Sequence, residues 1–344
     1  MRLTPDIFFS LVNNISAGMK IIRIGVIGVG HLGSSHIRNL QEIEDVEVVG
    51  FFDIDDRTAS EVADSTGLKS FKSREELFAE AEAVSIVTPT NTHYEIAASA
   101  FEHGLNLFIE KPICDKVEDA RKLVEIAREN GRTIQVGHIE RFSGTYSALS
   151  GMNLKPMFIE CHRLMQFQPR NLDVAVVHDL MIHDIDLVLH MNGSKPVKVD
   201  ANGVSVISDN VDIANARLTF ENGCVANLTA SRISQKGMRK MRIFQKNSYI
   251  TLDFLKNETR IYGLGSENSQ SRGIKVSEIQ LGDESRDIYL DSPDIVEQNP
   301  LLAELTAFVN SIRNDEEPMV TGEDGLAALE TASQIITSIN NSAM

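Results

Sequence analysis

The segment Val176–His190, VVHDLMIHDIDLVLH, places three histidines and three aspartates within fifteen residues. Both residue types can exchange protons with a substrate, and both can bind metal ions. If the segment is helical, Asp179 and His183 are neighbours because they lie four residues apart. Asp186 and His190 continue the same stripe. Three interpretations are open: acid/base chemistry, a metal site, or an ordinary solvent-exposed helix face.

A solvent-exposed helix face usually carries Lys, Glu, Arg or Gln, which form helices better than Asp and His do. A neutral imidazole can accept the proton of a hydroxyl group near pH 7, which is worth about 10²–10⁴-fold in rate. A metal site would have two ligands and no third with an obvious spacing, so we predict no metal. We predict acid/base chemistry for Asp179 and His183, and a solvent-exposed position for Asp186 and His190.

A glycine pattern near the N-terminus predicts a dinucleotide site. The apolar run Ile21–Ile27 is typical of a strand, and the loop GVGHLG at 28–33 leads from it into a helix. Gly28 allows a tight turn, Gly30 lets the backbone approach a pyrophosphate, and Gly33 lets the helix pack on the strand. The helix N-terminus offers N–H groups to the phosphates. The cofactor contacts predicted here are Gly28, Gly30, His31, Leu32 and Gly33.

A second strand, Val46–Phe52, ends in Asp53, which lies 20 residues after Gly33. A carboxylate at this position accepts hydrogen bonds from the ribose hydroxyls of NAD. It repels the 2′-phosphate of NADP by about 1 kcal/mol in water and about 4 kcal/mol at a protein surface, for charges about 4 Å apart. Arg57 is near enough in sequence to weaken the preference. We predict NAD as the cofactor, with NADP as the alternative.

Strands and helices alternate up to about residue 140, which predicts a parallel sheet in an α/β domain at 20–140. Ligands of such sheets gather at the C-terminal ends of the strands. Thr88, Pro89 and Glu110 follow two further strands, and we predict that they contact the cofactor.

After residue 140 the pattern changes to short strands, which predicts a second domain at 141–344 with a large, mostly antiparallel sheet. Asn222-Gly223 is a hairpin signal between two of these strands. Helices are expected near 174–191, 298–313 and 322–339. The expected strands are Pro156–Leu164, Val197–Ile207, Ile213–Phe220, Val225–Ser231, Met241–Gln245 and Tyr249–Phe254.

Composition limits the partners. The chain has 344 residues and a formal net charge of −16 at pH 7, which argues against nucleic acid and anionic membranes, because both bind basic surfaces. Cys114, Cys161 and Cys224 are far apart and fit no metal spacing, which favours reduced thiols in the cytoplasm. We interpret residues 1–19 as a short N-terminal extension, although 7–18 faintly resembles the apolar core of a signal peptide.

Glu110-Lys111-Pro112 at a strand end, after the glycine pattern and before Asp179-x-x-x-His183, resembles the Gfo/Idh/MocA oxidoreductases over nearly all of the chain after Lys20. The resemblance implies a Rossmann domain, a substrate domain with an open sheet, and a nicotinamide cofactor. It implies oxidation or reduction at a carbinol carbon of a sugar or cyclitol, and dimers or tetramers formed through the second sheet. A catalytically silent NAD-binding regulatory protein is the alternative, against which the intact catalytic motif weighs.

The resemblance also implies residue roles. His183 would be the catalytic base, Asp179 would orient a substrate hydroxyl or the imidazole, and Lys111 would stabilise the developing charge on the reacting oxygen. Lys111 would also contact the cofactor. Asn91 and His93 would line the nicotinamide ribose and the approach to the ring, with helix capping by Asn91 or Thr92 as the alternative.

Several stretches, among them VGHIERF at 136–142 and ECHRL at 160–164, are similar to the family's UDP-N-acetylglucosamine 3-dehydrogenase group. From 222 to 252 the chain has no acid and six basic residues, and arginine suits a diphosphate. Strand residues alternate faces, so about half of these side chains can point one way. A cyclitol or free sugar is the alternative substrate. The predicted substrate contacts are Arg141, Arg163, His183 and Arg232.

Overall fold

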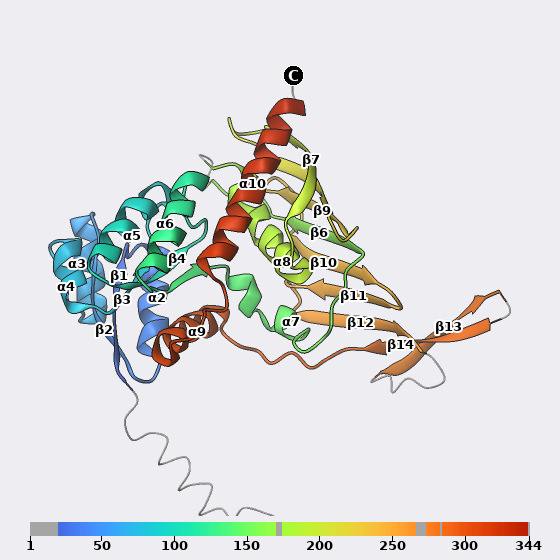
Figure 1. Ribbon diagram of the computed structural model, residues 1–344, viewed down its shortest axis with the longest axis horizontal. Coiled ribbons are helices and arrows are strands. Elements are labelled where there is room, and N and C mark those ends of the chain that lie inside the picture. The colour runs from blue at the N-terminus through green and yellow to red at the C-terminus, as the bar shows by residue number, and fades with distance from the viewer. Residues whose placement is uncertain (1–19, 170–173, 266–272, 283, 343–344) are drawn as a thin grey trace, which may run out of the picture. The chain divides into compact units, whose positions relative to one another are not determined.

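The computed structural model describes residues 20–169, 174–265, 273–282 and 284–342 (Figure 1), and the expected extension at 1–19 lies outside them. Contacts divide the chain into two compact units. The first comprises the described residues up to Glu110, with Leu123–Gln135 and Glu304–Thr321. The second comprises the described residues of Lys111–Lys122 and Val136–Ala303, and those from Gly322 onward. The units interleave along the sequence, and the domain boundary at residue 140 stays a prediction.

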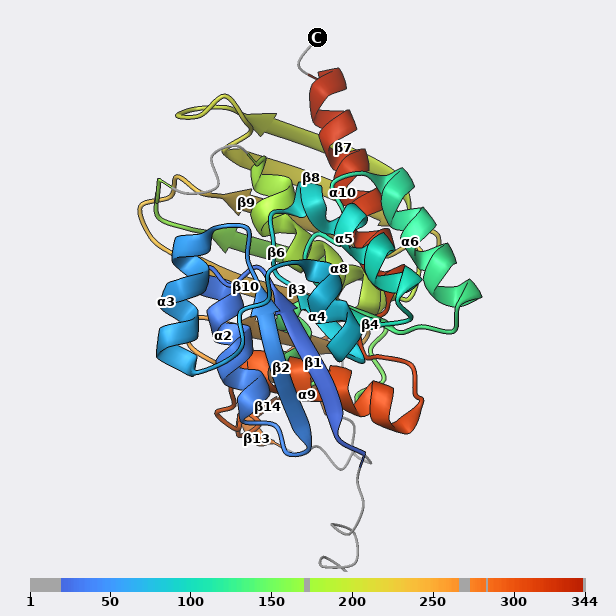
Figure 2. The same ribbon diagram turned by 90° about the vertical axis from the view of Figure 1, so that its left-hand side faces the viewer.

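The first unit is built on a five-stranded sheet with the order β2-β1-β3-β4-β5. β1 pairs in parallel with β2 and β3, and β3 pairs in parallel with β4; β1 and β2 are seen side by side in Figure 2. The strand order reverses between β1 and β3, which is where the C-terminal ends of parallel strands leave a crevice for a ligand. The strands are β1 Ile22–Ile27, β2 Val46–Phe52, β3 Ala83–Ile86, β4 Asn106–Glu110 and β5 Ile134–Gly137.

Helices α2, α4 and α5 pack on this sheet, whose middle strand, β3, is fully buried. The sequence did not reveal α3 and α4, which are short and mostly polar. Helix α9, Pro300–Asn314, contributes to this unit because Phe308 packs edge-on against Phe108 and the Glu304 carbonyl accepts from Gln135 Nε2 at 2.7 Å. The other helices are α2 His31–Gln41, α3 Asp56–Thr66, α4 Arg74–Glu80, α5 His93–Glu102 and α6 Val117–Glu129.

The second unit contains a nine-stranded sheet with the order β13-β14-β12-β11-β10-β6-β9-β8-β7. Among the described residues its neighbouring strands pair in the antiparallel sense except β6 with β9, so the expected mostly antiparallel sheet is confirmed. The hairpin at Asn222-Gly223 is confirmed between β8 and β9. Three strands, β12–β14, were not expected. The strands are β6 Phe158–Leu164, β7 Pro196–Val204, β8 Ile213–Phe220, β9 Val225–Ser231, β10 Met238–Gln245, β11 Ser248–Asp253, β12 Glu258–Leu264, β13 Ile274–Leu281 and β14 Glu284–Asp291.

Helices α8, Ile182–Asn192, and α10, Gly322–Ser342, cover one face of the nine-stranded sheet (Figure 1). Strands β6 and β8 alternate buried with more exposed side chains, so one face of the sheet carries the core and the other is open. The helices expected near 298–313 and 322–339 are confirmed as α9 and α10. No helix among the described residues is long and apolar enough to cross a membrane.

Candidate active site

The glycine loop at 28–33 has the room and the backbone shape that a pyrophosphate needs. Gly28 has φ +82°, and a Cβ on it would come within 2.6 Å of the Val87 carbonyl oxygen. A Cβ on Gly33 would lie 1.9 Å from the Gly28 carbonyl oxygen, so only glycine fits where α2 begins. Around Gly30 the space is open, and neighbouring His31 and Leu32 are exposed. These residues fit a dinucleotide phosphate at the N-terminus of α2.

Asp53 is fixed at the end of β2, beside the glycine loop. Its Oδ2 accepts a hydrogen bond from the Val29 amide at 2.7 Å, and its Oδ1 accepts one from the Asp55 amide at 2.9 Å. The carboxylate is partly exposed, so its remaining lone pairs can accept from ribose hydroxyls. Arg57 Nε donates to Glu61 at 2.9 Å, and this exposed pair turns the Arg57 charge toward another carboxylate.

The loop after β3 carries four of the predicted cofactor contacts. Thr88 is partly exposed, and its backbone carbonyl accepts from buried His93 at Nε2, 2.9 Å. Pro89 and Asn91 are exposed. Thr92 Oγ1 donates to the Pro89 carbonyl at 2.7 Å and lies 2.8 Å from Thr88 Oγ1, and it makes no side-chain cap on α5. The buried ring of His93 therefore holds this loop to the start of α5.

A buried histidine that the sequence did not single out holds Glu110. His36, on α2, is fully buried; its Nδ1 lies 2.9 Å from Ser85 Oγ and its Nε2 lies 3.2 Å from Glu110 Oε1. The pair connects α2, which begins at the glycine loop, with the end of β4. The sequence signal for this contact was the position of His36, three residues after Gly33 on the side of the helix that faces the sheet. A polar ring at such a position needs a buried hydrogen-bond partner.

Lys111 lies beside Asp179 in the second unit. Its Nζ donates to the Asp179 backbone carbonyl at 2.8 Å and lies 3.7 Å from Oδ1 of the Asp179 side chain. Both side chains are about one-fifth exposed, at 20% and 21%. A ligand can therefore reach the ammonium group and the carboxylate.

The helix expected near 174–191 is confirmed, and its first turn is of the π type. Val177–Met181 is a π-helical turn, and α8 follows from Ile182. Such turns occur frequently at functional sites because the extra residue in the turn redirects side chains and carbonyl groups. Here the turn carries Asp179, whose carbonyl group binds Lys111.

His183 is held in its neutral form. Burial lowers the pKa of its imidazole well below the ordinary value, and electrostatic interactions with Lys111, Arg163, His138 and Arg239 lower the pKa further. Among the described residues, its Nδ1 has no hydrogen-bond partner. A neutral imidazole near a lysine ammonium suits proton transfer from a hydroxyl group near pH 7. The structure thus brings Lys111, Asp179 and His183 together, and their chemical roles stay predictions.

The expected solvent exposure of Asp186 is wrong, and Arg141 is the reason. Asp186 is 1% exposed, and its two oxygens accept from Arg141 Nη2 at 2.6 Å and Nε at 2.8 Å. Arg141 also contacts Asp324 at 3.1 Å and His190 Nδ1 at 3.1 Å. A buried guanidinium needs carboxylate partners, and Arg141 has two, so its contacts do not support the predicted role in substrate binding. His190 is exposed, as expected.

Arg163 and Arg232, the other predicted arginine contacts, are also buried. Arg163 binds Asp184 with both arms of its fork at 2.8 and 3.1 Å, and donates to Glu140 at 2.7 Å. Arg232 donates to the Val174 carbonyl and lies 3.9 Å from Asp212. The sequence showed the basic residues but not which face of the sheet each would occupy. Their contacts with the protein's own groups do not support direct substrate binding.

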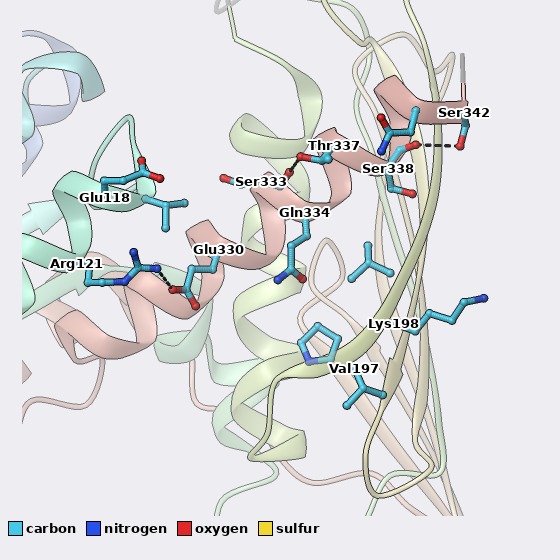
Figure 3. Close-up of a pocket in the computed structure, with 14 residues that line it drawn as sticks. Glu118, Arg121, Val197, Lys198, Glu330, Ser333, Gln334, Thr337, Ser338 and Ser342 are labelled. Carbon is cyan, nitrogen blue, oxygen red and sulfur yellow. Dashed lines mark hydrogen bonds and ion pairs between the residues drawn. The ribbon is translucent and has the colours of Figure 1, made fainter. Parts of the chain in front are cut away.

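A cavity of about 800 Å³ lies between the first turn of α6, the edge strand β7 and α10 (Figure 3). Arg121 and Glu330 form an ion pair in it at 2.8 Å. Ser338 Oγ accepts from the Ala201 amide at 2.9 Å, so α10 covers the free edge of β7. The cavity contains none of the predicted catalytic residues. In the parts of the chain that the structure describes, no three His, Cys, Asp or Glu side chains are arranged to hold a metal ion.

Comparison with known proteins gives matches along most of the chain. Residues 22–138 match the family described as an oxidoreductase family with an NAD-binding Rossmann fold, and residues 151–251 match the GFO/IDH/MocA C-terminal domain. The UDP-N-acetylglucosamine 3-dehydrogenase of Acidithiobacillus ferrooxidans is 38% identical over 91% of this chain and 96% of its own length.

A solved structure of a UDP-N-acetylglucosamine 3-dehydrogenase from Acidithiobacillus ferrooxidans superposes with a TM-score of 0.84 at 36% identity, covering 92% of this chain and 97% of the other. The myo-inositol 2-dehydrogenase of Thermotoga maritima is 25% identical over 90% of this chain and 93% of its own length. The nucleotide-sugar enzyme is therefore much more similar to this chain than this inositol enzyme is.

Proposed function

Because the chain belongs to the Gfo/Idh/MocA oxidoreductase family and is a dehydrogenase with an NAD-binding Rossmann domain, we propose that it oxidises the C3 hydroxyl of a UDP-linked sugar, UDP-N-acetylglucosamine, to a ketone. The observation that carries the proposal is the grouping of Lys111 and Asp179 with a neutral His183. The choice of substrate is supported by the 38% identity to an enzyme of that name.

In the proposed reaction, His183 accepts the proton of the C3 hydroxyl. Lys111 donates to the same oxygen and stabilises the negative charge that develops as the proton leaves. Asp179 accepts from a neighbouring hydroxyl of the sugar and keeps Lys111 in place. When bound, NAD supplies the acceptor for the hydride that leaves the carbinol carbon. Loss of one proton and one hydride converts the alcohol to the ketone.

The fit of the cofactor rests on the first unit. Glycine is required at positions 28 and 33, and the space at Gly30 is open, as a pyrophosphate requires. Asp53 is the residue that would hold the adenosine ribose. The Thr88–His93 loop follows β3, which is the neighbour of β1. We propose contacts from Glu110 and Lys111 at the end of β4, where His36 fixes the Glu110 carboxylate.

The experiment that tests this function measures NADH formation while the purified protein receives NAD and UDP-N-acetylglucosamine. We expect turnover of UDP-N-acetylglucosamine to exceed turnover of myo-inositol and of glucose. Higher efficiency with either free compound, with no inhibition by UDP, would assign the cyclitol or free-sugar alternative. Binding of NAD without turnover of any sugar would favour the regulatory protein.

Two variants test the catalytic assignment. We expect His183→Ala and Lys111→Ala each to lower kcat at least about 100-fold, because each loses a group that acts on the reacting oxygen. The affinity of His183→Ala for NADH, measured by fluorescence titration, should stay near that of the parent, because His183 is not among the proposed cofactor contacts. Activity within about three-fold of the parent would remove that residue from the mechanism.

We also propose a homodimer or homotetramer formed through the open face of the nine-stranded sheet. Phe158, Phe244, Tyr249 and Tyr262 are cross-strand neighbours on four adjacent strands, with ring centroids 4.7–5.9 Å apart. Such a row of aromatic side chains on one face favours contact with another protein surface. A monomeric mass by light scattering would contradict this assembly. The cytoplasmic location stays a prediction.

A further inference from the structure

Arg163, the buried arginine of β6, holds the residue that follows the proposed catalytic base in the sequence. Its Nη2 donates to Asp184 Oδ1 at 2.8 Å, and its Nε donates to Asp184 Oδ2 at 3.1 Å. Two parallel hydrogen bonds of this kind fix the orientation of a carboxylate as well as its distance. Asp184 is joined to His183 by a peptide bond, so the same contact restrains the backbone that carries the imidazole.

The third nitrogen of the same guanidinium binds a different segment. Arg163 Nη1 donates to Glu140 Oε1 at 2.7 Å, and Glu140 is buried in the short 3-10 helix η2, Ile139–Phe142, which follows β5. Glu140 comes two residues after His138, whose ring interacts electrostatically with His183. One guanidinium thus joins three segments, namely β6, η2 and the start of α8.

The restrained segment follows a wide helical turn, so ordinary α-helical geometry does not by itself fix its rotation. The π-helical turn Val177–Met181 ends directly before α8, and Asp184 is the third residue of α8. A π turn holds one residue more than an α-helical turn does. If the wide turn formed after His183 instead, the imidazole would point about 100° away around the helix axis. The contact between Asp184 and β6 distinguishes these two rotations.

Stability alone is a poor explanation for such a buried network. Taking charges out of water is costly, and apolar side chains of similar volume often stabilise a fold at least as well. What a fully satisfied network provides is a single arrangement, because a shifted carboxylate would lose its partner inside the protein. Two acids on Arg163 therefore favour a role in holding the start of α8 in one position.

The charge of Arg163 also acts on the imidazole, because a guanidinium stays protonated in proteins. Burial is the largest cause of the lowered pKa of His183, and electrostatic interaction with Arg163 lowers this pKa further. The other groups with the same effect are Lys111, which is paired with Asp179, and also His138 and Arg239. Loss of the Arg163 charge would therefore raise the pKa of His183.

We propose that Arg163 is a positioning residue for the catalytic base, and that its contact with Asp184 fixes where His183 meets the substrate hydroxyl. This inference rests on the proposed function, in which His183 accepts the proton of that hydroxyl. Proton transfer needs the two heavy atoms about 2.6–3.2 Å apart. A displacement of the imidazole by about 1 Å therefore slows the reaction strongly. In this role Arg163 touches neither the substrate nor the cofactor.

The test compares Arg163→Gln, Arg163→Lys, Asp184→Asn and the double variant Arg163→Gln/Asp184→Asn with the control Asp186→Asn. Asp186 lies two residues further along α8, is also buried, and makes the same kind of two-armed contact, with Arg141 at 2.6 and 2.8 Å. The control thus breaks a comparable contact that is not on the residue next to His183. The measurements are kcat and KM for UDP-N-acetylglucosamine, the pH dependence of kcat/KM, NADH affinity and the thermal midpoint.

We expect Arg163→Gln to lower kcat at least about ten-fold, while KM and NADH affinity stay within about three-fold of the parent. The acid limb of kcat/KM should move to higher pH in Arg163→Gln, because a charge that lowers the pKa of His183 is gone. Arg163→Lys should also lose kcat, since it lacks the fork, but its acid limb should stay at the parental pH, since it keeps the charge.

The Asp184 variants test whether Arg163 acts through this carboxylate. Asp184→Asn should lower kcat as well, and the double variant should lose no more than about three-fold beyond Arg163→Gln, because both substitutions break one contact. The double variant also serves if Arg163→Gln does not fold, since it removes the charge of one carboxylate that Arg163 neutralised. Asp186→Asn should lower the thermal midpoint and leave kcat and the acid limb near those of the parent.

Parental kcat and a parental acid limb in Arg163→Gln would overturn the proposal. A ten-fold higher KM at parental kcat would also overturn it and return Arg163 to substrate binding. Losses that multiply in the double variant would show that Arg163 does not act through Asp184, and an equal loss of kcat in Asp186→Asn would show a general effect of stability. All of these results leave the proposed function standing, whereas a parent that oxidises no sugar would contradict that function and this inference with it.

Discussion

Replacing Asp53 by asparagine tests how this protein discriminates between NAD and NADP. The carboxylate of Asp53 is fixed by the amides of Val29 and Asp55 at 2.7 and 2.9 Å. Asparagine has the same shape, and its oxygen can keep one of these two contacts. The substitution therefore removes the charge with little change of geometry. Loss of the other contact weakens binding of both cofactors equally. This effect therefore cancels when the affinities for NADH and NADPH are compared as a ratio.

The size of the preference for NADH follows from the distance between the Asp53 carboxylate, bound to the ribose, and the 2′-phosphate of NADPH. Two unit charges about 4 Å apart repel by about 1 kcal/mol in water and about 4 kcal/mol at the effective dielectric of a protein surface. Asp53 is partly exposed, which reduces the upper value. Arg57 does not offset the repulsion, because its guanidinium pairs with Glu61. We expect the parent to prefer NADH over NADPH by roughly 10- to 100-fold.

The assay is a fluorescence titration of NADH and NADPH against the parent and Asp53→Asn at two salt concentrations. The ratio of the two dissociation constants should fall toward one in the variant, mainly through tighter NADPH binding. Added salt should narrow the ratio in the parent, because the carboxylate is partly exposed. Equal affinities in the parent, or an unchanged ratio in the variant, would refute this account.

Three further predictions concern both units. Because the pKa of His183 is lowered and its neutral form is the base, the acid limb of kcat/KM should lie below about pH 6.5, and a limb above that value would contradict the neutral assignment. Gly33→Ala should abolish NADH binding in titrations, since its Cβ would lie 1.9 Å from the Gly28 carbonyl oxygen. Asp186→Asn should lower the free energy of unfolding, measured by denaturant titration, by about 3 kcal/mol, because it removes the negative charge of the buried ion pair with Arg141. A loss below about 1 kcal/mol would show that Asp324 alone compensates the charge of Arg141.

The sequence by itself determined the elements that local rules govern. A glycine pattern between a strand and a helix identified the loop at 28–33, because only glycine avoids the clashes at positions 28 and 33. Alternating strands and helices predicted the parallel sheet, and the turn at Asn222-Gly223 predicted the β8–β9 hairpin. The order of strand, glycine loop and helix and the turn at Asn222-Gly223 are patterns within short stretches of sequence, so they can be read along the chain.

Only the tertiary structure decided how charges far apart in sequence are paired. Asp186 had the sequence position of an exposed helix residue, yet it binds Arg141, 45 residues away, in the core. The structure buries Arg163, one of the arginines predicted to contact the substrate, and leaves Arg239 partly exposed, although the two are neighbours on adjacent strands. A count of charges cannot make this distinction, because the free energy of an ion pair depends on burial and on partners that the fold alone brings together.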